Sequence, residues 1–109
     1  MTKANISIGL IGLGTIGGGV AKILKEKAAA VNRQVGVPLT LKRAADLDEK
    51  RKDSPYFAPE VFTRDARQIL EDPDIDIVIE LIGGEKPAKS FIQEALERGK
   101  HVVTANKEV

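Results

Sequence analysis

Three glycines near the N-terminus have a spacing that suits the binding of a diphosphate. Gly12, Gly14 and Gly17 form a G-x-G-x-x-G pattern directly after an apolar run over residues 6–11. The first glycine of such a pattern permits a tight turn, the second lets the backbone approach a pyrophosphate, and the third lets a helix pack closely on a strand. The amides at the start of that helix then face the phosphates. The pattern predicts a dinucleotide-binding turn, and the alternative is a glycine-rich turn in another kind of α/β domain.

An acidic residue further along the chain is placed to contact a ribose. Asp46 ends the second predicted strand, over residues 39–46. In βαβ dinucleotide units, an acid at this position accepts hydrogen bonds from the adenosine ribose hydroxyls. The interval from the glycines exceeds the usual spacing of about 20 residues, which a loop before the strand explains. Asp46 and Asp48 also suit a turn. Lys50 and Arg51 are near enough in sequence to contact a 2′-phosphate, so the choice between NAD and NADP stays open.

Apolar periodicity predicts a helix directly after the glycine turn. Apolar residues recur at helical spacing over residues 15–30, and a loop is expected over 32–38 because Gly36 and Pro38 break regular structure. The buried face of this helix is predicted to consist of Ile16, Val20, Ile23 and Leu24.

The second half of the chain continues the alternation of strands and helices. Its longest apolar stretch is rich in β-branched residues, as expected for a buried parallel strand, and the charge of Glu80 interrupts it. In order, the predicted elements are a short strand over 61–62, a short helix that Pro73 stops, a strand over 76–82, a helix from Pro87 to Gly99, and a strand over 101–104.

This order of elements predicts a doubly wound parallel α/β sheet of the Rossmann type. We expect strand order 3-2-1-4-5, with the ligand over the carboxyl ends of the strands, at the switch point between the first and fourth strands. The glycine turn, Asp46, Gly83, Gly84 and residues 104–107 all follow predicted strand ends. They are therefore predicted to converge on one edge of the sheet.

Length and composition limit the classes of function. The 109 residues suit one domain with one core. A formal net charge of +1 and few aromatic residues give no electrostatic or stacking basis for binding nucleic acid or a membrane surface. The absence of cysteine excludes disulfides and cysteine-ligated metals, and no metal site is predicted. No apolar run reaches the length of a membrane span, and no signal peptide is evident, so we expect a cytoplasmic protein.

Three longer blocks carry a family resemblance: GLGTIGGGV over 12–20, IDIVIELIGG over 75–84 and GKHVVTANK over 99–107. Through them the chain resembles homoserine dehydrogenase, over its N-terminal, cofactor-binding part only. The resemblance implies NAD(P)-dependent interconversion of L-homoserine and L-aspartate 4-semialdehyde, in the pathway to threonine, methionine and isoleucine. By motif match, the pyrophosphate loop would consist of Gly12, Leu13, Gly14, Thr15 and Ile16, and the nicotinamide half would lie along Gly83, Gly84, Thr104 and Ala105.

The resemblance also places Lys107 at the active site. Reduction of an aldehyde needs a hydride at carbon and a proton at oxygen, and an ammonium group can polarise the carbonyl and supply that proton. For the reverse reaction its pKa would have to be lowered by burial or by a neighbouring cation. The alternative is a solvated charge at the start of the next helix. Asn106 is predicted either to hold the cofactor or to cap that helix, and Glu80 and His101 are interpreted as structural.

The resemblance further implies that residues 1–109 form a cofactor-binding domain, and that a substrate-binding and dimerising domain follows in the complete enzyme. We expect the complete protein to be a homo-oligomer and this chain alone to bind dinucleotide without turnover. Two alternatives stay open: a freestanding NAD(P)-sensing module, and the cofactor domain of another two-domain NAD(P) oxidoreductase. One sugar oxidoreductase family has a similar Gly-Lys-His-Val strand followed by Glu-Lys-Pro, and Asn106 before Lys107 argues against it.

Overall fold

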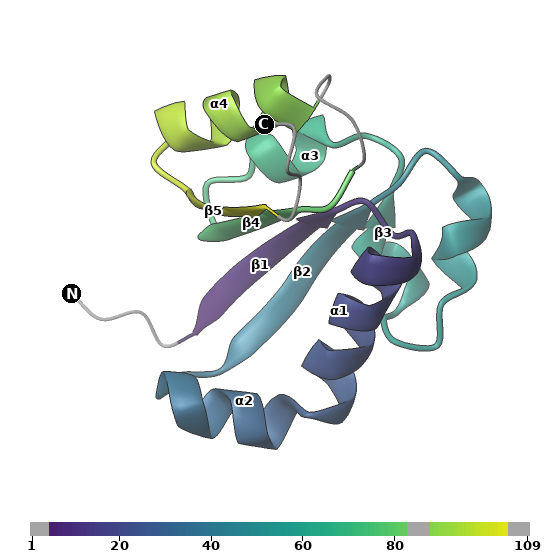
Figure 1. Ribbon diagram of the computed structural model, residues 1–109, viewed down its shortest axis with the longest axis vertical. Coiled ribbons are helices and arrows are strands. Elements are labelled where there is room, and N and C mark those ends of the chain that lie inside the picture. The colour runs from purple at the N-terminus through teal and green to yellow at the C-terminus, as the bar shows by residue number, and fades with distance from the viewer. Residues whose placement is uncertain (1–4, 83–87, 105–109) are drawn as a thin grey trace.

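A computed structural model describes residues 5–82 and 88–104 of the chain (Figure 1). All strand pairs are parallel and the order is β3-β2-β1-β4-β5, which confirms the predicted strand order and the Rossmann-type fold. The strands are β1 (Ile6–Ile11), β2 (Leu39–Ala45), β3 (Phe62–Thr63), β4 (Ile77–Glu80) and β5 (His101–Thr104). The helices are α1 (Thr15–Glu26), α2 (Ala28–Val35), α3 (Arg67–Leu70) and α4 (Ala88–Glu97), with 3₁₀ turns η1 (Glu49–Asp53) and η2 (Pro59–Val61).

The sheet lies between two layers of helix. Helices α1 and α2 cover one face and α3 and α4 cover the other (Figure 1). Successive residues of a strand point to opposite faces, so Leu10 and Ile11 of the central strand belong to different cores. Each fully buried Leu or Ile side chain contributes about 1.5–3 kcal/mol. The core under α3 and α4 contains Ile11, Ala45, Ile69, Leu70, Ile75, Val78 and Ala95, and the core under α1 contains Leu10, Leu13, Ala21 and Ala44.

The region after α1 differs from the prediction. The predicted single helix over 15–30 is two helices that meet at Lys27, and most of the predicted loop over 32–38 is the second of them, α2. Gly36 ends α2 with a φ of 92°, and its amide donates to the carbonyl of Asn32 (2.8 Å). The loop was expected because Gly36 and Pro38 break regular structure, but Gly36 caps the C-terminus of α2 and so allows the helix to extend to Val35.

Helix α1 packs on the sheet through its smallest residues. A Cβ at Gly17 would lie 1.9 Å from the carbonyl oxygen of Gly12, and Ala21 is 1% exposed. Ile16 and Ile23 are instead 63% and 52% exposed, so their predicted place on the buried face is wrong. The close approach of helix and glycine turn leaves room for glycine and alanine, and it directs the larger side chains outward. Within the described ranges, no helix is long and apolar enough to cross a membrane.

The carboxyl ends of the three central strands lie level with one another. The sheet register places Ile11 beside Ala45 of β2 and beside Glu80 of β4. Beyond the strand ends, the amide of Gly12 donates to the carbonyl of Ala45 (2.8 Å) and the amide of Leu81 donates to the carbonyl of Ile11 (2.9 Å). These bonds hold the turns that follow β1, β2 and β4 at one edge of the sheet.

Candidate functional site

A cavity of about 520 Å³ lies over the carboxyl ends of the strands. Its size is within the range of about 300–1,000 Å³ that is usual for small-molecule sites. The residues around it follow four different strands, with one more contributed by α4. They are Ile11, Gly12 and Gly14 at the end of β1, Ala45, Asp46 and Leu47 at the end of β2, Arg64, Asp65, Ala66 and Arg67 after β3, Leu81 and Ile82 after β4, and Phe91 of α4.

At Gly12 and Gly14 the glycine turn borders this cavity with main-chain atoms only. Gly12 has a φ of 101°, and a Cβ there would lie 3.0 Å from the carbonyl carbon of Leu81, so a side chain is excluded by both conformation and space. Gly14 precedes α1, whose N-terminus has no side-chain cap. Apart from its chain neighbours and the local helix backbone, no atom of residues 5–82 and 88–104 lies within 4 Å of the place of a Gly14 Cβ, and Gly14 lines the cavity. A side chain at Gly14 would therefore enter the space beside the open helix N-terminus, where a phosphate group fits.

Asp46 lies directly after β2 and joins the second strand to the glycine turn. Its Oδ2 accepts a hydrogen bond from the amide of Leu13 (2.7 Å), and its Oδ1 accepts one from the amide of Asp48 (2.8 Å). The bond from the Asp48 amide closes a local turn, as the sequence suggested. The bond from the Leu13 amide connects Asp46 to the glycine turn. Each carboxylate oxygen accepts more than one hydrogen bond, so these contacts leave capacity for ribose hydroxyls.

Four basic residues near the strand ends line two separate cavities. Lys50 and Arg51, predicted as contacts for a 2′-phosphate, line a separate pocket of about 260 Å³ with Leu13, and Arg51 lies 3.8 Å from a carboxylate oxygen of Asp48. The cavity that holds Asp46 is instead bordered by Arg64 and Arg67, which sequence analysis missed. Little in the sequence indicates that Arg64 and Arg67 lie at a strand end, because the strand that they follow, β3, has only two residues.

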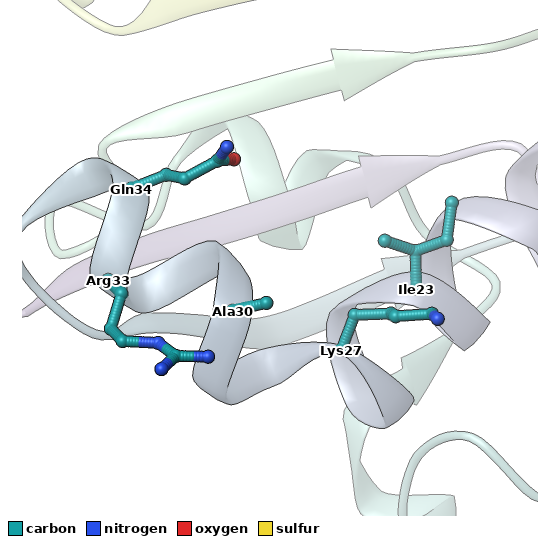
Figure 2. Close-up of a pocket in the computed structure, with 5 residues that line it drawn as sticks. All are labelled: Ile23, Lys27, Ala30, Arg33 and Gln34. Atoms are coloured by element: carbon teal, nitrogen blue, oxygen red, sulfur yellow. The ribbon is translucent and has the colours of Figure 1, made fainter.

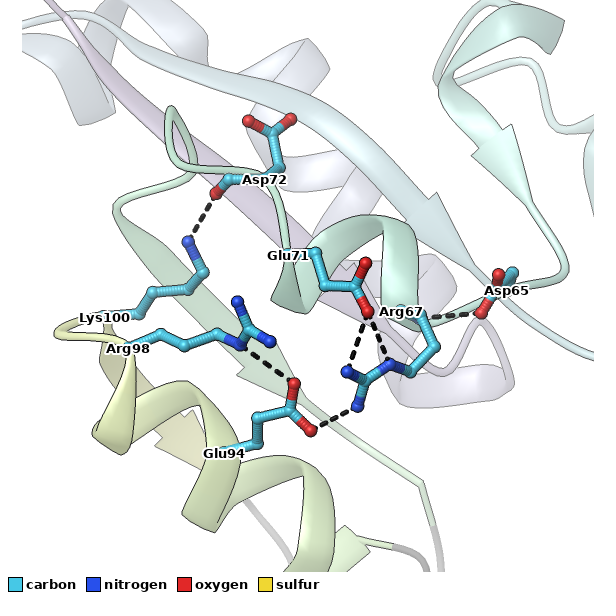
Figure 3. A network of polar contacts seen from close by, with 7 residues as sticks. All are labelled: Asp65, Arg67, Glu71, Asp72, Glu94, Arg98 and Lys100. Carbon is cyan, nitrogen blue, oxygen red and sulfur yellow. Dashed lines mark hydrogen bonds and ion pairs between the residues drawn. The ribbon is translucent and has the colours of Figure 1, made fainter.

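The charge of Arg67 is shared with neighbouring glutamates (Figure 3). Its guanidinium contacts Glu71 of the same turn at 2.7 Å and Glu94 of α4, and Nε of Arg98 donates to Glu94 at 2.9 Å. The hydrogen bond from Arg67, joined by that from Arg98, holds the pKa of Glu94 below its usual value. Arg67 therefore borders the cavity as part of an ion-pair network that links α3 to α4.

Glu80 is fully buried at the carboxyl end of β4. Its Oε1 accepts a hydrogen bond from the Thr104 hydroxyl (2.7 Å), and its Oε2 accepts one from the amide of Ile82 (2.6 Å). Glu80 thus ties the end of β4 to the end of β5, the two strands from which the predicted nicotinamide and active-site segments continue. The structural interpretation of Glu80 is supported, and its partners, which the sequence did not reveal, are identified.

The structure does not describe every predicted site residue. Gly83, Gly84, Ala105, Asn106 and Lys107 lie outside the described residues, so their roles stay predictions. Of the predicted residues that are described, Gly12, Gly14 and Asp46 line one cavity, Leu13 and Gly17 belong to the same turn and helix, and Thr104 lies at the same edge of the sheet. Within the described ranges, no group of three or more His, Cys, Asp or Glu residues is placed to hold a metal ion.

A further hollow, on the outer side of the helices, differs from the cavity over the strand ends. It lies between the outer surfaces of α1 and α2 and is lined by Ile23, Lys27, Ala30, Arg33 and Gln34 (Figure 2). None of these residues belongs to the glycine turn or follows a strand end. The hollow therefore lacks the features that assign function to the cavity over the strand ends.

The parallel sheet, the glycine turn, the strand-end acid and the cavity above the switch point together define a dinucleotide-binding domain of the Rossmann type. The family model described as "Homoserine dehydrogenase, NAD binding domain" matches residues 12–109. This chain belongs to that family.

Similar proteins agree with the family match. The homoserine dehydrogenase of Bacillus subtilis is 42% identical over 95% of this chain, and that of Neisseria gonorrhoeae is 40% identical over 95%. The chain spans 24% of the length of each of these relatives. Among solved structures, a homoserine dehydrogenase from Thiobacillus denitrificans matches with a TM-score of 0.87 and 41% identity, over 94% of this chain and 24% of that one. A levoglucosan dehydrogenase, at 24% identity and a TM-score of 0.73, shares the fold.

Proposed function

We propose that this chain binds NAD or NADP as the cofactor domain of a homoserine dehydrogenase. The observation that carries the proposal is the cavity that Gly12, Gly14 and Asp46 share over the carboxyl ends of the strands. The backbone of the glycine turn and the N-terminus of α1 would hold the pyrophosphate, with Leu13, Thr15, Ile16 and Gly17 completing that segment. Asp46 would accept hydrogen bonds from the adenosine ribose.

The complete enzyme would interconvert L-homoserine and L-aspartate 4-semialdehyde, an assignment supported by the names of the relatives. The bound nicotinamide supplies or accepts a hydride. Gly83, Gly84, Thr104, Ala105 and Asn106 would lie along the nicotinamide half, and the Lys107 ammonium would give the aldehyde oxygen its proton. A homo-oligomeric state and a cytoplasmic location belong to the same proposal.

Calorimetric titration of the 109-residue chain with NADH and NADPH tests the cofactor site. We expect saturable binding, and we expect Gly14→Val to abolish it because the new side chain enters the space beside the helix N-terminus. Gly19→Val is the matched control. Among the residues that the structure describes, a Cβ at Gly19 also meets no atom within 4 Å, but Gly19 is not among those that line the cavity.

Three outcomes separate the possibilities. Binding lost only in Gly14→Val would support the site. Equal binding by wild type and Gly14→Val would place the dinucleotide elsewhere. Binding of neither dinucleotide by the wild-type chain would contradict the proposed function of this chain.

A further inference from the structure

Two arginines border the cavity that contains Asp46, and their surroundings differ. Arg67 is paired with Glu71 and Glu94, as Figure 3 shows. Arg64 forms no ion pair with any acid in the part of the chain that the structure describes. Of the two positive charges at this cavity, that of Arg64 is therefore the one without a protein counter-charge among described residues.

Arg64 is hydrogen-bonded to the backbone that follows Asp46. Its Nε donates to the carbonyl of Leu47 (3.1 Å), the residue that follows Asp46. A guanidinium has five N–H donors, and this bond uses one of them. The others remain available for a ligand, and planar guanidinium groups bind phosphate oxygens in pairs of parallel hydrogen bonds.

The acids of the cavity are held by backbone amides. Both oxygens of Asp46 accept bonds from the amides of Leu13 and Asp48, and Oδ1 of Asp65 accepts one from the amide of Arg67 (2.9 Å). These amide dipoles offset part of the negative charge of the two carboxylates. An anionic group beside Leu47 would thus be attracted by the Arg64 guanidinium. Its repulsion by Asp46 and Asp65 would be reduced, because both carboxylates already accept hydrogen bonds from backbone amides.

We propose that Arg64 binds the 2′-phosphate of NADP(H) and gives this domain a preference for NADP(H) over NAD(H). The inference rests on the proposed function, because it assumes that the adenosine ribose lies at Asp46. It replaces the sequence-based choice of Lys50 and Arg51, which line the other pocket. The ligand class is a ribose 2′-phosphate monoester, and the determinant is a single exposed arginine after β3.

Titration of the 109-residue chain with NADPH, NADH, 2′,5′-ADP and 5′-AMP tests the assignment, because the last two ligands differ only in the 2′-phosphate. We expect Arg64→Gln to raise the Kd for NADPH and 2′,5′-ADP about 10- to 100-fold, the usual range for a lost charge-assisted hydrogen bond. The Kd for NADH and 5′-AMP should change by less than about twofold. Arg64→Lys should restore part of the affinity, since it keeps the charge but not the planar fork.

Arg51→Gln and Arg33→Gln are the controls: Arg51 lines the second pocket and Arg33 is exposed on α2. Unchanged phosphate-dependent affinity in both would support Arg64. A loss in Arg51→Gln with none in Arg64→Gln would overturn the proposal, as would an equal loss of NADPH and NADH binding in Arg64→Gln. Wild-type chain that binds NADH as tightly as NADPH would overturn it while leaving the proposed function intact. Failure of both dinucleotides to bind would overturn both.

Discussion

At the scale of single residues, one buried carboxylate joins two strand ends that border the predicted nicotinamide site. Glu80 accepts hydrogen bonds from a main-chain amide beyond β4 and from the hydroxyl of Thr104 at the end of β5. A carboxylate is suited to this place because it only accepts hydrogen bonds and has two oxygens. The segments that carry Gly83-Gly84 and Lys107 therefore leave strands whose ends share one acceptor group.

Replacing Glu80 tests this link. We expect Glu80→Leu to lower the free energy of unfolding by about 1–3 kcal/mol, because it leaves the amide of Ile82 without its acceptor. Glu80→Gln should lose less, since its amide oxygen can still accept one of the two bonds. Urea denaturation of both variants measures the difference. A Glu80→Leu chain as stable as the wild type would show that the two bonds make no net contribution.

The sequence predicted some of these residues better than others for a physical reason. The roles of Gly12 and Gly17 were predictable because a glycine pattern between a strand and a helix encodes a backbone path. The partner of Asp46 was not, because Leu13 is 33 residues away and donates only a main-chain amide, which any residue possesses. Thr104 is 24 residues from Glu80, so this contact also depended on knowing the sheet register.

At the scale of elements, α3 is a helix of four residues that is held by charges as well as by its core contacts. Its own residues Ile69 and Leu70 are fully buried, and the network of Arg67, Glu94 and Arg98 ties it to α4. Helices this short have little stability of their own. The position of Arg67 at the rim of the cavity therefore depends on α4, a later element of the chain.

The charge of Glu94 gives this link a pH dependence. Its pKa is lowered in the folded state from the usual 4.5, so the stabilisation is present above pH 4.5 and is lost as the pH falls through the lowered pKa. We expect the wild type to be more stable than Glu94→Gln at neutral pH, with the difference disappearing in acid. Thermal unfolding across this pH range measures it.

Glu97 supplies the control for that experiment. It lies on the same helix and makes no ion pair with the described residues. Glu97→Gln should therefore show a smaller difference at neutral pH, and added salt should reduce the Glu94 effect because the network is largely exposed. A Glu94→Gln chain with the same pH profile as the wild type would contradict a stabilising network.

Two predictions of elements failed because the sequence pattern does not show how far a helix extends before a breaker or how closely a helix packs on a sheet. Residues 32–35 were predicted as loop because Gly36 and Pro38 follow them, but Gly36 only ends α2 and the helix continues up to it. The buried face of α1 was predicted to be Ile16, Val20, Ile23 and Leu24. Val20 does pack against the core, but Ile16 and Ile23 are exposed, and the residues closest to the sheet and its turn are Gly17 and Ala21. Apolar periodicity locates a helix, but a very close approach to a sheet selects small residues instead.

At the scale of the whole molecule, the alternation of strands and helices was enough to predict the strand order. Parallel strands joined by helices have few right-handed arrangements, so the topology followed once the elements were placed. The assignment of side chains to particular cavities was less predictable. It depends on where the two-residue strand β3 positions the chain after it, and a strand so short leaves almost no pattern in the sequence.

The family assignment has a consequence for activity. The matched model is that of an NAD-binding domain, and the chain spans 24% of the length of its Bacillus subtilis relative. We expect the 109-residue chain to bind cofactor but not to oxidise NADPH in the presence of L-aspartate 4-semialdehyde. The measurement is NADPH absorbance over time, with the Bacillus subtilis enzyme as positive control. Turnover by the chain alone would show that it contains a complete active site.

The bond between Asp46 and the Leu13 amide also bears on how quickly a ligand associates. Both of its partners belong to the chain itself, so the bond ties the glycine turn to the end of β2 as the sheet folds. The entropy lost in ordering this turn is therefore lost during folding, not when a ligand arrives. We therefore expect association at the pyrophosphate end to proceed without a slow rearrangement of the loop, at a rate limited by encounter.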